Sequence, residues 1–379
     1  MMIEIILFLL FLFLLLNYIY FLSNILGGLK QLKNDDLAKI SDEYVSVIIP
    51  FRNESDNILT SLISLASQNY AQEKFEVIYV NDSSTDDSYE KILNAAKPIN
   101  FNVISLSEFS HDKAFKKKAV SYGIEHSRGE IIITTDADCT HNQNWLRELI
   151  SGFDSATGFI SGPVSFNERQ NIFTKIQSLE FAGLVLSGAG LIGIGKPIIC
   201  NGANLAFRRS VYHQLHGYHD QMHLSSGEDE LLMQKIAAET DYSVKFCWNK
   251  DAVVFTQPNE NIRNFFQQRK RWASKGLFYK NKLLIMSLVL IYLFYLGITV
   301  QILLSIFLSK LFLISFGLSL ISKFVIEYKI LNKGVNFLFK VNLMKYFFLT
   351  EIFQIFYLTL AGFLGIIGNY KWKDRILKR

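Results

Sequence analysis

The chain has 379 residues, of which 50% are hydrophobic and 14% aromatic, with 32 Phe and only 5 Pro. A soluble domain of this length is rarely so rich in large apolar residues, so membrane segments are expected. The net charge of +5 is modest and basic residues do not alternate with aromatic ones, which argues against a nucleic-acid partner. Three widely spaced cysteines predict neither a disulfide framework nor a zinc site, and they fit a reducing compartment.

Residues 1–29 are predicted to be an N-terminal membrane anchor. Residues 5–22 are almost wholly apolar and approach the roughly 20 residues that a spanning helix needs. No basic region precedes them and no small-residue cleavage site follows, which disfavours a signal peptide. Because Lys30, Lys33 and Lys39 come next, the positive-inside bias places the following domain in the cytoplasm.

Residues 30–257 are predicted to form an α/β domain with a parallel sheet, because strand and helix patterns alternate along them. The expected strands are residues 45–49, 75–80 and 103–106 and a run that begins at Ile131, and the expected helices are residues 56–70, a segment opened by Asp86 and Asp87, and residues 113–127. Several of these strands end in charged or polar residues, which should meet at one edge of the sheet.

Two carboxylates, Asp136 and Asp138, follow the apolar run that begins at Ile131. Residues one position apart point the same way from an extended backbone. Paired oxygen ligands of this kind can hold Mg²⁺ or Mn²⁺, which usually keep several waters and bind through substrate phosphates. The alternative is an ordinary polar strand end.

Phosphate binding by a glycine-rich loop is not expected. Residues 188–193 spell G-x-G-x-x-G, but they follow a helical pattern rather than a strand. Because the sequence has no P-loop either, a phosphate group would be held through a metal and side chains.

A series of short motifs resembles the inverting glycosyltransferases of family 2, in the membrane-embedded branch that carries Q-x-x-R-W. This branch includes cellulose, chitin and hyaluronan synthases and ceramide glucosyltransferase. The motifs are residues 47–54, 80–86, 116–120 with Gly123, 136–138, 201–208, 227–230 and 268–272. Each motif alone is weak, whereas their order and spacing are specific. The resemblance implies a GT-A fold, a divalent metal and a UDP- or GDP-sugar donor.

At the donor end, the resemblance implies that Asp82 contacts the nucleobase and that Asp136 takes part in nucleotide-sugar binding. An Asx-turn that leads into the next helix is the alternative for Asp82. Glu54 and Lys116 are expected to flank the same pocket, with Lys116 as the counter-charge to the diphosphate. Residues 116–118 also fit a solvated helix face, and the choice among the three lysines stays open.

Asp229 lies in Gly-Glu-Asp-Glu, ahead of an apolar helical segment. Inverting sugar transfer needs a base for the proton of the acceptor hydroxyl, while a metal stabilises the departing diphosphate. The resemblance implies that Asp229 is this base. An N-cap role is the alternative for Asp229, and its neighbours Glu228 and Glu230 are alternatives for the base.

Residues 258–282 are predicted to form an amphipathic helix at the membrane surface, because aromatic residues alternate there with Arg and Lys. On this basis Trp272 would be an interfacial anchor. The resemblance implies that Trp272 packs against the acceptor sugar, and that Gln268 and Arg271 contact acceptor and diphosphate. Arginine suits a diphosphate through bidentate pairing. The two interpretations are compatible.

Residues 283–379 are predicted to be a C-terminal transmembrane region. Residues 283–322 are apolar except for Lys310, which suggests a hairpin with Lys310 near its tip. The lysines that follow, from Lys323 to Lys345, predict a cytoplasmic loop. Residues 346–367 are a further candidate span that carries Glu351 and Gln354. Three C-terminal spans would leave the basic tail outside, against the positive-inside bias, unless one segment only dips into the membrane.

The function expected from these features is membrane-bound inverting sugar transfer at the cytoplasmic face of the inner membrane. The acceptor would be lipid-linked or a polysaccharide, and partner subunits are an open alternative. Two other classes are weighed. A metal-dependent phosphohydrolase would need no acceptor motif, and an inert nucleotide-sugar-binding protein would lack a catalytic carboxylate, although none is missing here.

Overall fold

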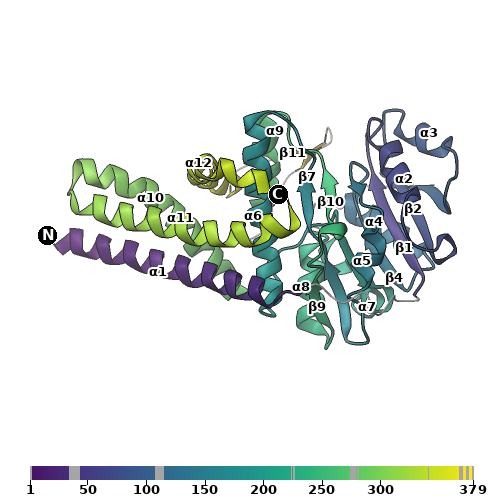
Figure 1. Ribbon diagram of the computed structural model, residues 1–379, viewed down its shortest axis with the longest axis horizontal. Coiled ribbons are helices and arrows are strands. Elements are labelled where there is room, and N and C mark those ends of the chain that lie inside the picture. The colour runs from purple at the N-terminus through teal and green to yellow at the C-terminus, as the bar shows by residue number, and fades with distance from the viewer. Residues whose placement is uncertain are drawn as a thin grey trace.

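A mixed α/β domain joined to a bundle of long apolar helices makes up the protein, as a computed structural model shows (Figure 1). The structure describes residues 2–33, 43–106, 115–222, 224, 227–273, 279, 281–339, 341–366, 370–372 and 375–377.

The large sheet has seven strands in the described part of the chain, in the order β3-β2-β1-β4-β8-β6-β9. Their bounds are β1 (Val45–Phe51), β2 (Phe75–Asn81), β3 (Phe101–Ser105), β4 (Ile131–Thr134), β6 (Thr157–Ser161), β8 (Leu205–Arg208) and β9 (Ser243–Phe246). The expected strands are all present, and β1 continues through Pro50. The missing N–H of Pro50 is tolerated because β4, on one side of β1, pairs only as far as Ile48.

The prediction of a parallel sheet is correct for β3, β2, β1 and β4, and for the β6–β9 pair, but it is wrong for β8. Strand β8 runs antiparallel to both β4 and β6. The cause is local: the Thr134 hydroxyl at the end of β4 donates to the Gly202 carbonyl oxygen at 2.9 Å, so the chain enters β8 where β4 ends and has to run back.

A second sheet of three strands lies beside the carboxyl end of β4. It consists of β5 (Thr140–His141), β10 (Val254–Thr256) and β7 (Val164–Phe166), with β10 in the middle. Strand β10 is antiparallel to β5 and parallel to β7. The small sheet thus brings residue 256 back to the turn that contains Asp136 and Asp138.

Helices cover both faces of the large sheet, and the strands alternate between them. Val47 and Ile49 point into a core with the helices α2 and α5, whereas Ile48 points into a second core with α4. The second core continues into the bundle, so the domain and the bundle share one interior. The helices of the domain are α2 (Ile58–Ala66), α3 (Ser88–Leu93), α4 (Phe115–Glu125), α5 (Trp145–Ile150), α6 (Ile172–Gly193), α7 (Arg209–Gln214), α8 (Glu230–Glu239) and α9 (Ile262–Ala273).

Among the described residues, five helices are long and apolar enough to cross a membrane by length and composition. They are α1 (Met2–Gln31), α6, α10 (Lys282–Phe307), α11 (Leu311–Leu338) and Asn342–Phe363, which includes most of α12 (Phe347–Ile366). In Figure 1, α1, α10 and α11 run side by side away from the sheets, whereas α6 crosses between bundle and domain. Helix α6 is also more deeply buried, since 61% of its apolar segment lies inside the protein, against 28% for that of α1.

Small residues let α1 and α6 cross at close range. A Cβ on Gly28 would lie 1.8 Å from the carbonyl oxygen of Gly190, and one on Gly190 would lie 2.4 Å from that of Ile25. The backbones touch here, and neither position has room for a side chain. The G-x-G-x-x-G run is therefore a helix-packing surface, as its helical surroundings suggested.

The predicted hairpin after residue 282 is present, with its break between α10 and α11 at residues 308–310. The cytoplasmic loop predicted to begin at Lys323 is wrong for the described residues up to Leu338, because α11 continues to that residue. Lys323 is fully buried and pairs with Glu351 and Glu327. The positive-inside bias treats every lysine as a solvated charge and cannot identify one that is neutralised inside a bundle. Lys340 lies outside the described residues.

Helix α12 crosses α10 and does not run alongside it. Gln354 accepts a hydrogen bond from Tyr295 at 3.2 Å, and Gly362, eight residues further on, still lies against Tyr292. A step of eight positions along α12 thus corresponds to a step of only three positions along α10, as expected for helices that cross. Beyond α12, the short strands β11 (Tyr370–Trp372) and β12 (Arg375–Leu377) pair, and β11 lies beside α9.

Candidate active site

One cavity of about 1330 Å³ runs from the carboxyl ends of β1, β2 and β4, beneath α9, to the space between α6, α10 and α12. All the residues that the sequence singled out line it, although they come from distant segments: Glu54, Asp82, Lys116, Asp136, Asp138, Asp229, Gln268, Arg271 and Trp272. Their roles stay predictions, but their convergence in one cavity is a finding.

Two loops tied together by hydrogen bonds form one end of the cavity. They follow β1 and β2, and each contains a residue with left-handed backbone, Asn53 (φ 52°) and Ser83 (φ 54°). The Asn53 side-chain oxygen accepts a hydrogen bond from the backbone N–H of Thr85 at 2.8 Å. Arg52 donates to the carbonyl oxygen of Asp82 at 2.8 Å, and the Asp82 side chain is buried. This end is therefore built before a ligand binds.

Lys116 is the lysine of α4 that faces the cavity. Its Nζ lies 2.7 Å from Asp136 Oδ1 and 3.2 Å from Glu228 Oε1. Burial lowers the pKa of Lys116, but Asp136 and Glu228 outweigh burial and raise this pKa well above its usual value. Lys117 instead donates to the carbonyl oxygens of Gln221 and Leu224. Of the three lysines at residues 116–118, Lys116 is therefore the one that lines the cavity.

The expectation that Asp136 and Asp138 share an extended backbone is wrong. Strand β4 ends at Thr134, and the chain then turns, with the Cys139 N–H donating to the Asp136 carbonyl oxygen at 3.1 Å. Both carboxylates still line the cavity. Asp138 is fixed from the small sheet, because the Thr256 hydroxyl donates to its Oδ2 at 3.0 Å. The sequence analysis missed Thr256, since a three-residue strand has no visible period.

These residues fit a divalent cation held mainly through a phosphorylated ligand. Asp136 and Asp138 offer hard oxygen donors on the cavity wall, as Mg²⁺ and Mn²⁺ prefer. Within the described ranges, no group of three or more His, Cys, Asp or Glu side chains could hold a metal by itself. A cation held by Asp136 and Asp138 would take its remaining ligands from phosphate oxygens and water.

Asp229 caps a helix and also lines the cavity. It caps α8, where its Oδ1 accepts from the N–H of Glu230 at 2.9 Å, and its Oδ2 accepts from the N–H of Gly202 at 3.0 Å. It also lines the cavity, with only 8% of its surface exposed. Its neighbours are engaged elsewhere, because Glu228 pairs with Lys116 and Glu230 accepts from the Tyr279 hydroxyl at 2.9 Å.

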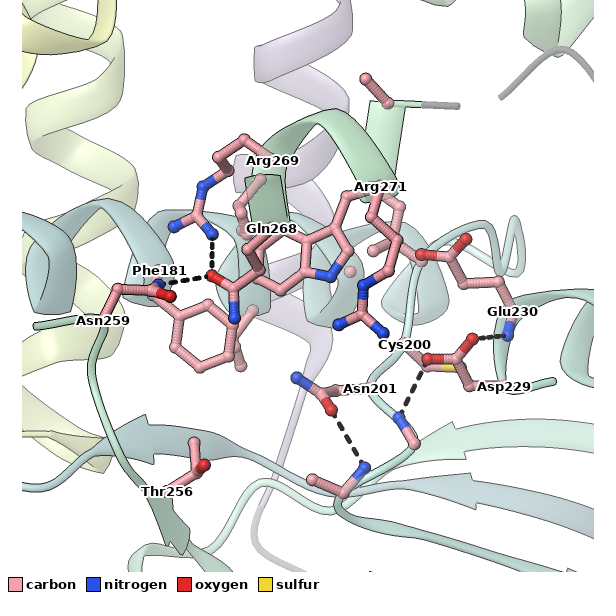
Figure 2. Close-up of a pocket in the computed structure, with 18 of the residues that line it drawn as sticks. Phe181, Cys200, Asn201, Asp229, Glu230, Thr256, Asn259, Gln268, Arg269 and Arg271 are labelled. Carbon is pink, nitrogen blue, oxygen red and sulfur yellow. Dashed lines mark hydrogen bonds between the residues drawn. The ribbon is translucent and has the colours of Figure 1, made fainter. Parts of the chain in front are cut away.

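Helix α9 carries the Gln-Arg-Lys-Arg-Trp run over Asp229 (Figure 2). Gln268 is held by two donors, Asn259 Nδ2 at 2.9 Å and Arg269 Nη1 at 2.6 Å. Trp272 stacks on Phe181 of α6 with ring centroids 5.9 Å apart, and is half-buried in the cavity. The predicted helix extended to residue 282, but residues 274–278 and 280 lie outside the described part of the chain.

Arg269 is a second residue of the cavity, after Thr256, that the sequence analysis missed. Its guanidinium pairs with Glu180 of α6 in the interior, and Glu180 also accepts from the Tyr357 hydroxyl of α12. The same guanidinium lies 4.3 Å from the centre of the Trp272 ring. Arg269 thus touches both Gln268 and Trp272. A partner 89 residues away gives no local signal that could have revealed the pair.

Known proteins resemble this chain over most of its length. The glycosyl transferase family 2 model matches residues 46–215, and that of glycosyl transferase family group 2 matches residues 131–365. The glycosyltransferase AglE of Haloferax volcanii is 31% identical over 54% of this chain and 64% of that protein. A poly-beta-1,6-N-acetyl-D-glucosamine synthase of Staphylococcus epidermidis is 27% identical over 62% of this chain and 55% of that protein. The chain thus spans a little over half the length of these relatives.

The mannosyltransferase PcManGT from Pyrobaculum calidifontis, solved in complex with GDP-Man and Mn²⁺, shares the fold. The TM-score is 0.56 at 18% identity, and the match covers 95% of this chain and 97% of that one. The expected GT-A fold is therefore confirmed. Because the second family model covers more than half of the chain, the resemblance inferred from the motifs is confirmed as well, and the chain belongs to glycosyltransferase family 2.

Proposed function

We propose that the protein is a membrane-bound inverting glycosyltransferase that moves a sugar from a nucleotide-diphospho-sugar to a lipid-linked or glycan acceptor. The observation that carries this proposal is the single cavity that joins the Lys116 and Asp136 end to Asp229 and to Gln268 and Trp272. A donor end, a base and an acceptor end in one space suit group transfer. A phosphohydrolase would not need an acceptor end.

In this mechanism the nucleotide lies against the loops after β1 and β2, with Asp82 toward the base and Lys116 and Arg271 toward the diphosphate. Asp136 and Asp138 would hold Mg²⁺ or Mn²⁺, which when bound neutralises charge on the leaving diphosphate. Asp229 takes the proton of the acceptor hydroxyl, whose oxygen forms a bond to the anomeric carbon. The bond from that carbon to the diphosphate oxygen breaks, and the electron pair leaves with the nucleoside diphosphate.

We also propose that α1, α10 and α11 span the inner membrane with the α/β domain in the cytoplasm. Lys30 and Lys33 at the domain end of α1 support this orientation. The crossing of α12 over α10, and the place of β11 beside α9, support a C-terminus on the same side as the domain. Such a topology removes the conflict with the basic tail, because α12 need not be a fourth span.

The test is to incubate membranes that contain the protein with radiolabelled UDP- and GDP-sugars and to analyse lipid and polymer fractions. We expect one donor class to give a labelled glycoside, and no label with Asp229→Asn. Release of free sugar without any glycoside, at undiminished rate in native membranes, would favour the phosphohydrolase instead. Absence of both transfer and hydrolysis with every donor would favour an inert binding protein.

A further inference from the structure

The cavity continues past Asp229 as an apolar arm between α6, α10 and α12. We use this name for the part of the cavity lined by Val185, Leu288, Val289, Tyr292, Leu358 and Ala361. The three helices that enclose it are candidates for membrane-embedded segments. The arm is continuous with the site where the acceptor hydroxyl would meet Asp229.

The walls of the apolar arm do not suit a sugar chain. None of the six side chains carries a charge, and the one hydroxyl among them, of Tyr292, is turned to the Thr359 carbonyl oxygen at 3.3 Å. A glycan would bring several hydroxyl groups per sugar into this space and leave them without partners, which is costly. A hydrocarbon chain has no hydrogen bonds to lose in the apolar arm, and its removal from water is favourable.

The apolar arm reaches the outer surface of the bundle. Val289 lines the arm and is also 42% exposed, and its neighbours on α10, Met286 and Leu293, are exposed apolar residues. On α12, Leu360 and Phe363 are exposed in the same way. The mouth is therefore flanked by surfaces that suit lipid, at the end of α10 nearest to the α/β domain.

We propose that the acceptor is an amphiphile that enters sideways from the membrane, with its hydrocarbon tail in the apolar arm and its polar head beneath Gln268. The inference rests on the proposed function for the transfer step, but tail binding itself needs no catalysis. The head places its nucleophilic oxygen toward Asp229, and the tail fixes the depth of the molecule. The acceptor class is thus lipid rather than free glycan.

A matched pair of substitutions on α10 tests the apolar arm. Leu288→Trp puts a large ring into the arm, whereas Leu303→Trp puts the same ring on an exposed part of α10 away from the cavity and its mouth. A second pair on α12, Ala361→Phe and Ile352→Phe, repeats the comparison should Leu288→Trp fold poorly. We expect transfer of label from the sugar donor into lipid to fall at least tenfold in the first member of each pair, and to stay within twofold in the second.

Binding is measured separately with a diazirine-tailed dodecyl phosphate and the full-length protein in nanodiscs. We expect saturable photolabelling of α10 and α12. Dodecyl phosphate should compete with this labelling, whereas inorganic phosphate should not. Leu288→Trp should reduce the labelling at least fivefold relative to Leu303→Trp. Labelling that inorganic phosphate abolishes would show that only the head is recognised and would overturn the inference.

Different results would contradict the proposed function and the tail site. Labelling without any sugar transfer would overturn the proposed function and leave the tail site standing. Transfer that is normal in both Leu288→Trp and Ala361→Phe, or labelled product found only in a polymer fraction, would overturn the tail site and leave the transferase standing.

Discussion

Arg269 and Glu180 form an ion pair that is almost completely buried between α9 and α6, and its arginine is one of two donors to Gln268. Hydrophobic residues of similar volume often stabilise a protein as well as a buried ion pair does, so stability alone does not explain the pair. The position of the ion pair offers an explanation, because Arg269 also packs on Trp272. We infer that the pair fixes the acceptor side of the cavity.

The first prediction concerns this pair. Arg269→Gln or Glu180→Gln leaves one buried charge unpaired, which should destabilise the protein by about 3–5 kcal/mol. The double variant should lose less than the sum of the two singles, because no unpaired charge remains. Apparent melting temperatures in detergent measure all three. Strictly additive losses would mean that Arg269 and Glu180 act independently. Glu148→Gln, which changes another buried carboxylate outside the cavity, is the control.

The second prediction concerns Asp229→Asn. The amide keeps the volume and can still accept the hydrogen bonds from Gly202 and Glu230, so α8 should keep its cap. It cannot take a proton, so transfer should fall by roughly 10²–10⁴-fold. Nucleotide binding, measured by calorimetry, should be unchanged. A variant that transfers sugar at the normal rate would exclude Asp229 as the base.

The third prediction is metal dependence. Because Asp136 and Asp138 supply few ligands, we expect EDTA to abolish donor-dependent transfer and Mg²⁺ or Mn²⁺ to restore it. Thr256→Val removes the hydroxyl that fixes Asp138 and should raise the metal concentration needed for half-maximal rate. Full transfer in EDTA would contradict a metal role for both carboxylates.

The fourth prediction concerns pH and His141, which lies between Ser64 and Thr135 behind the acidic turn. Burial lowers the pKa of His141 to about 3. In the unfolded chain this pKa is about 6.5, so between these values only the unfolded state binds the proton, and stability falls as pH falls. From pH 7 to pH 5 the loss from this group is about 2 kcal/mol. The difference in melting temperature between the wild type and His141→Gln should therefore be smaller at pH 5 than at pH 7. The same difference at both pH values would contradict the lowered pKa of His141.

The sequence predicted which residues after β1, β2 and β4 line the cavity, because these residues lie in local motifs at strand ends. Asp82 and Asp136 each follow a strand whose apolar run is easy to identify, and parallel neighbours bring such ends together. The part of the cavity beneath α9 was predicted less completely. Its geometry depends on contacts between α6, α9 and α12, such as Glu180 with Arg269, and pairs this distant leave no pattern along the chain.

The prediction of the long apolar helices shows the same contrast between local and distant signals. Apolar length predicted α1, α10 and α11, but α6 was missed because it lies in the middle of the α/β domain and is mostly buried. Lys323 was misplaced because a lysine in an apolar stretch predicts a boundary when its carboxylate partners cannot be seen. Its burial between α11 and α12 can be recognised only once the helices are packed.

The last prediction concerns Trp272 and distinguishes an acceptor platform from a packing residue. The ring stacks on Phe181 and lies under the Arg269 guanidinium, while it also lines the cavity. If Trp272 only packs, Trp272→Phe should keep most of these contacts, and transfer should stay within a few-fold of normal.

If Trp272 also supports the acceptor, the smaller ring replaces only part of its contact area. Trp272→Ala should then raise the acceptor concentration needed for half-maximal transfer at least tenfold. Nucleotide binding should be unchanged, because Asp82 and Lys116 lie at the other end of the cavity. Slow hydrolysis of the donor without acceptor should also survive, since water needs no platform. Both rates are measured on the same purified variant in lipid. Equal losses of hydrolysis and transfer would mean that Trp272 supports the fold or the donor end, and the acceptor role would be wrong.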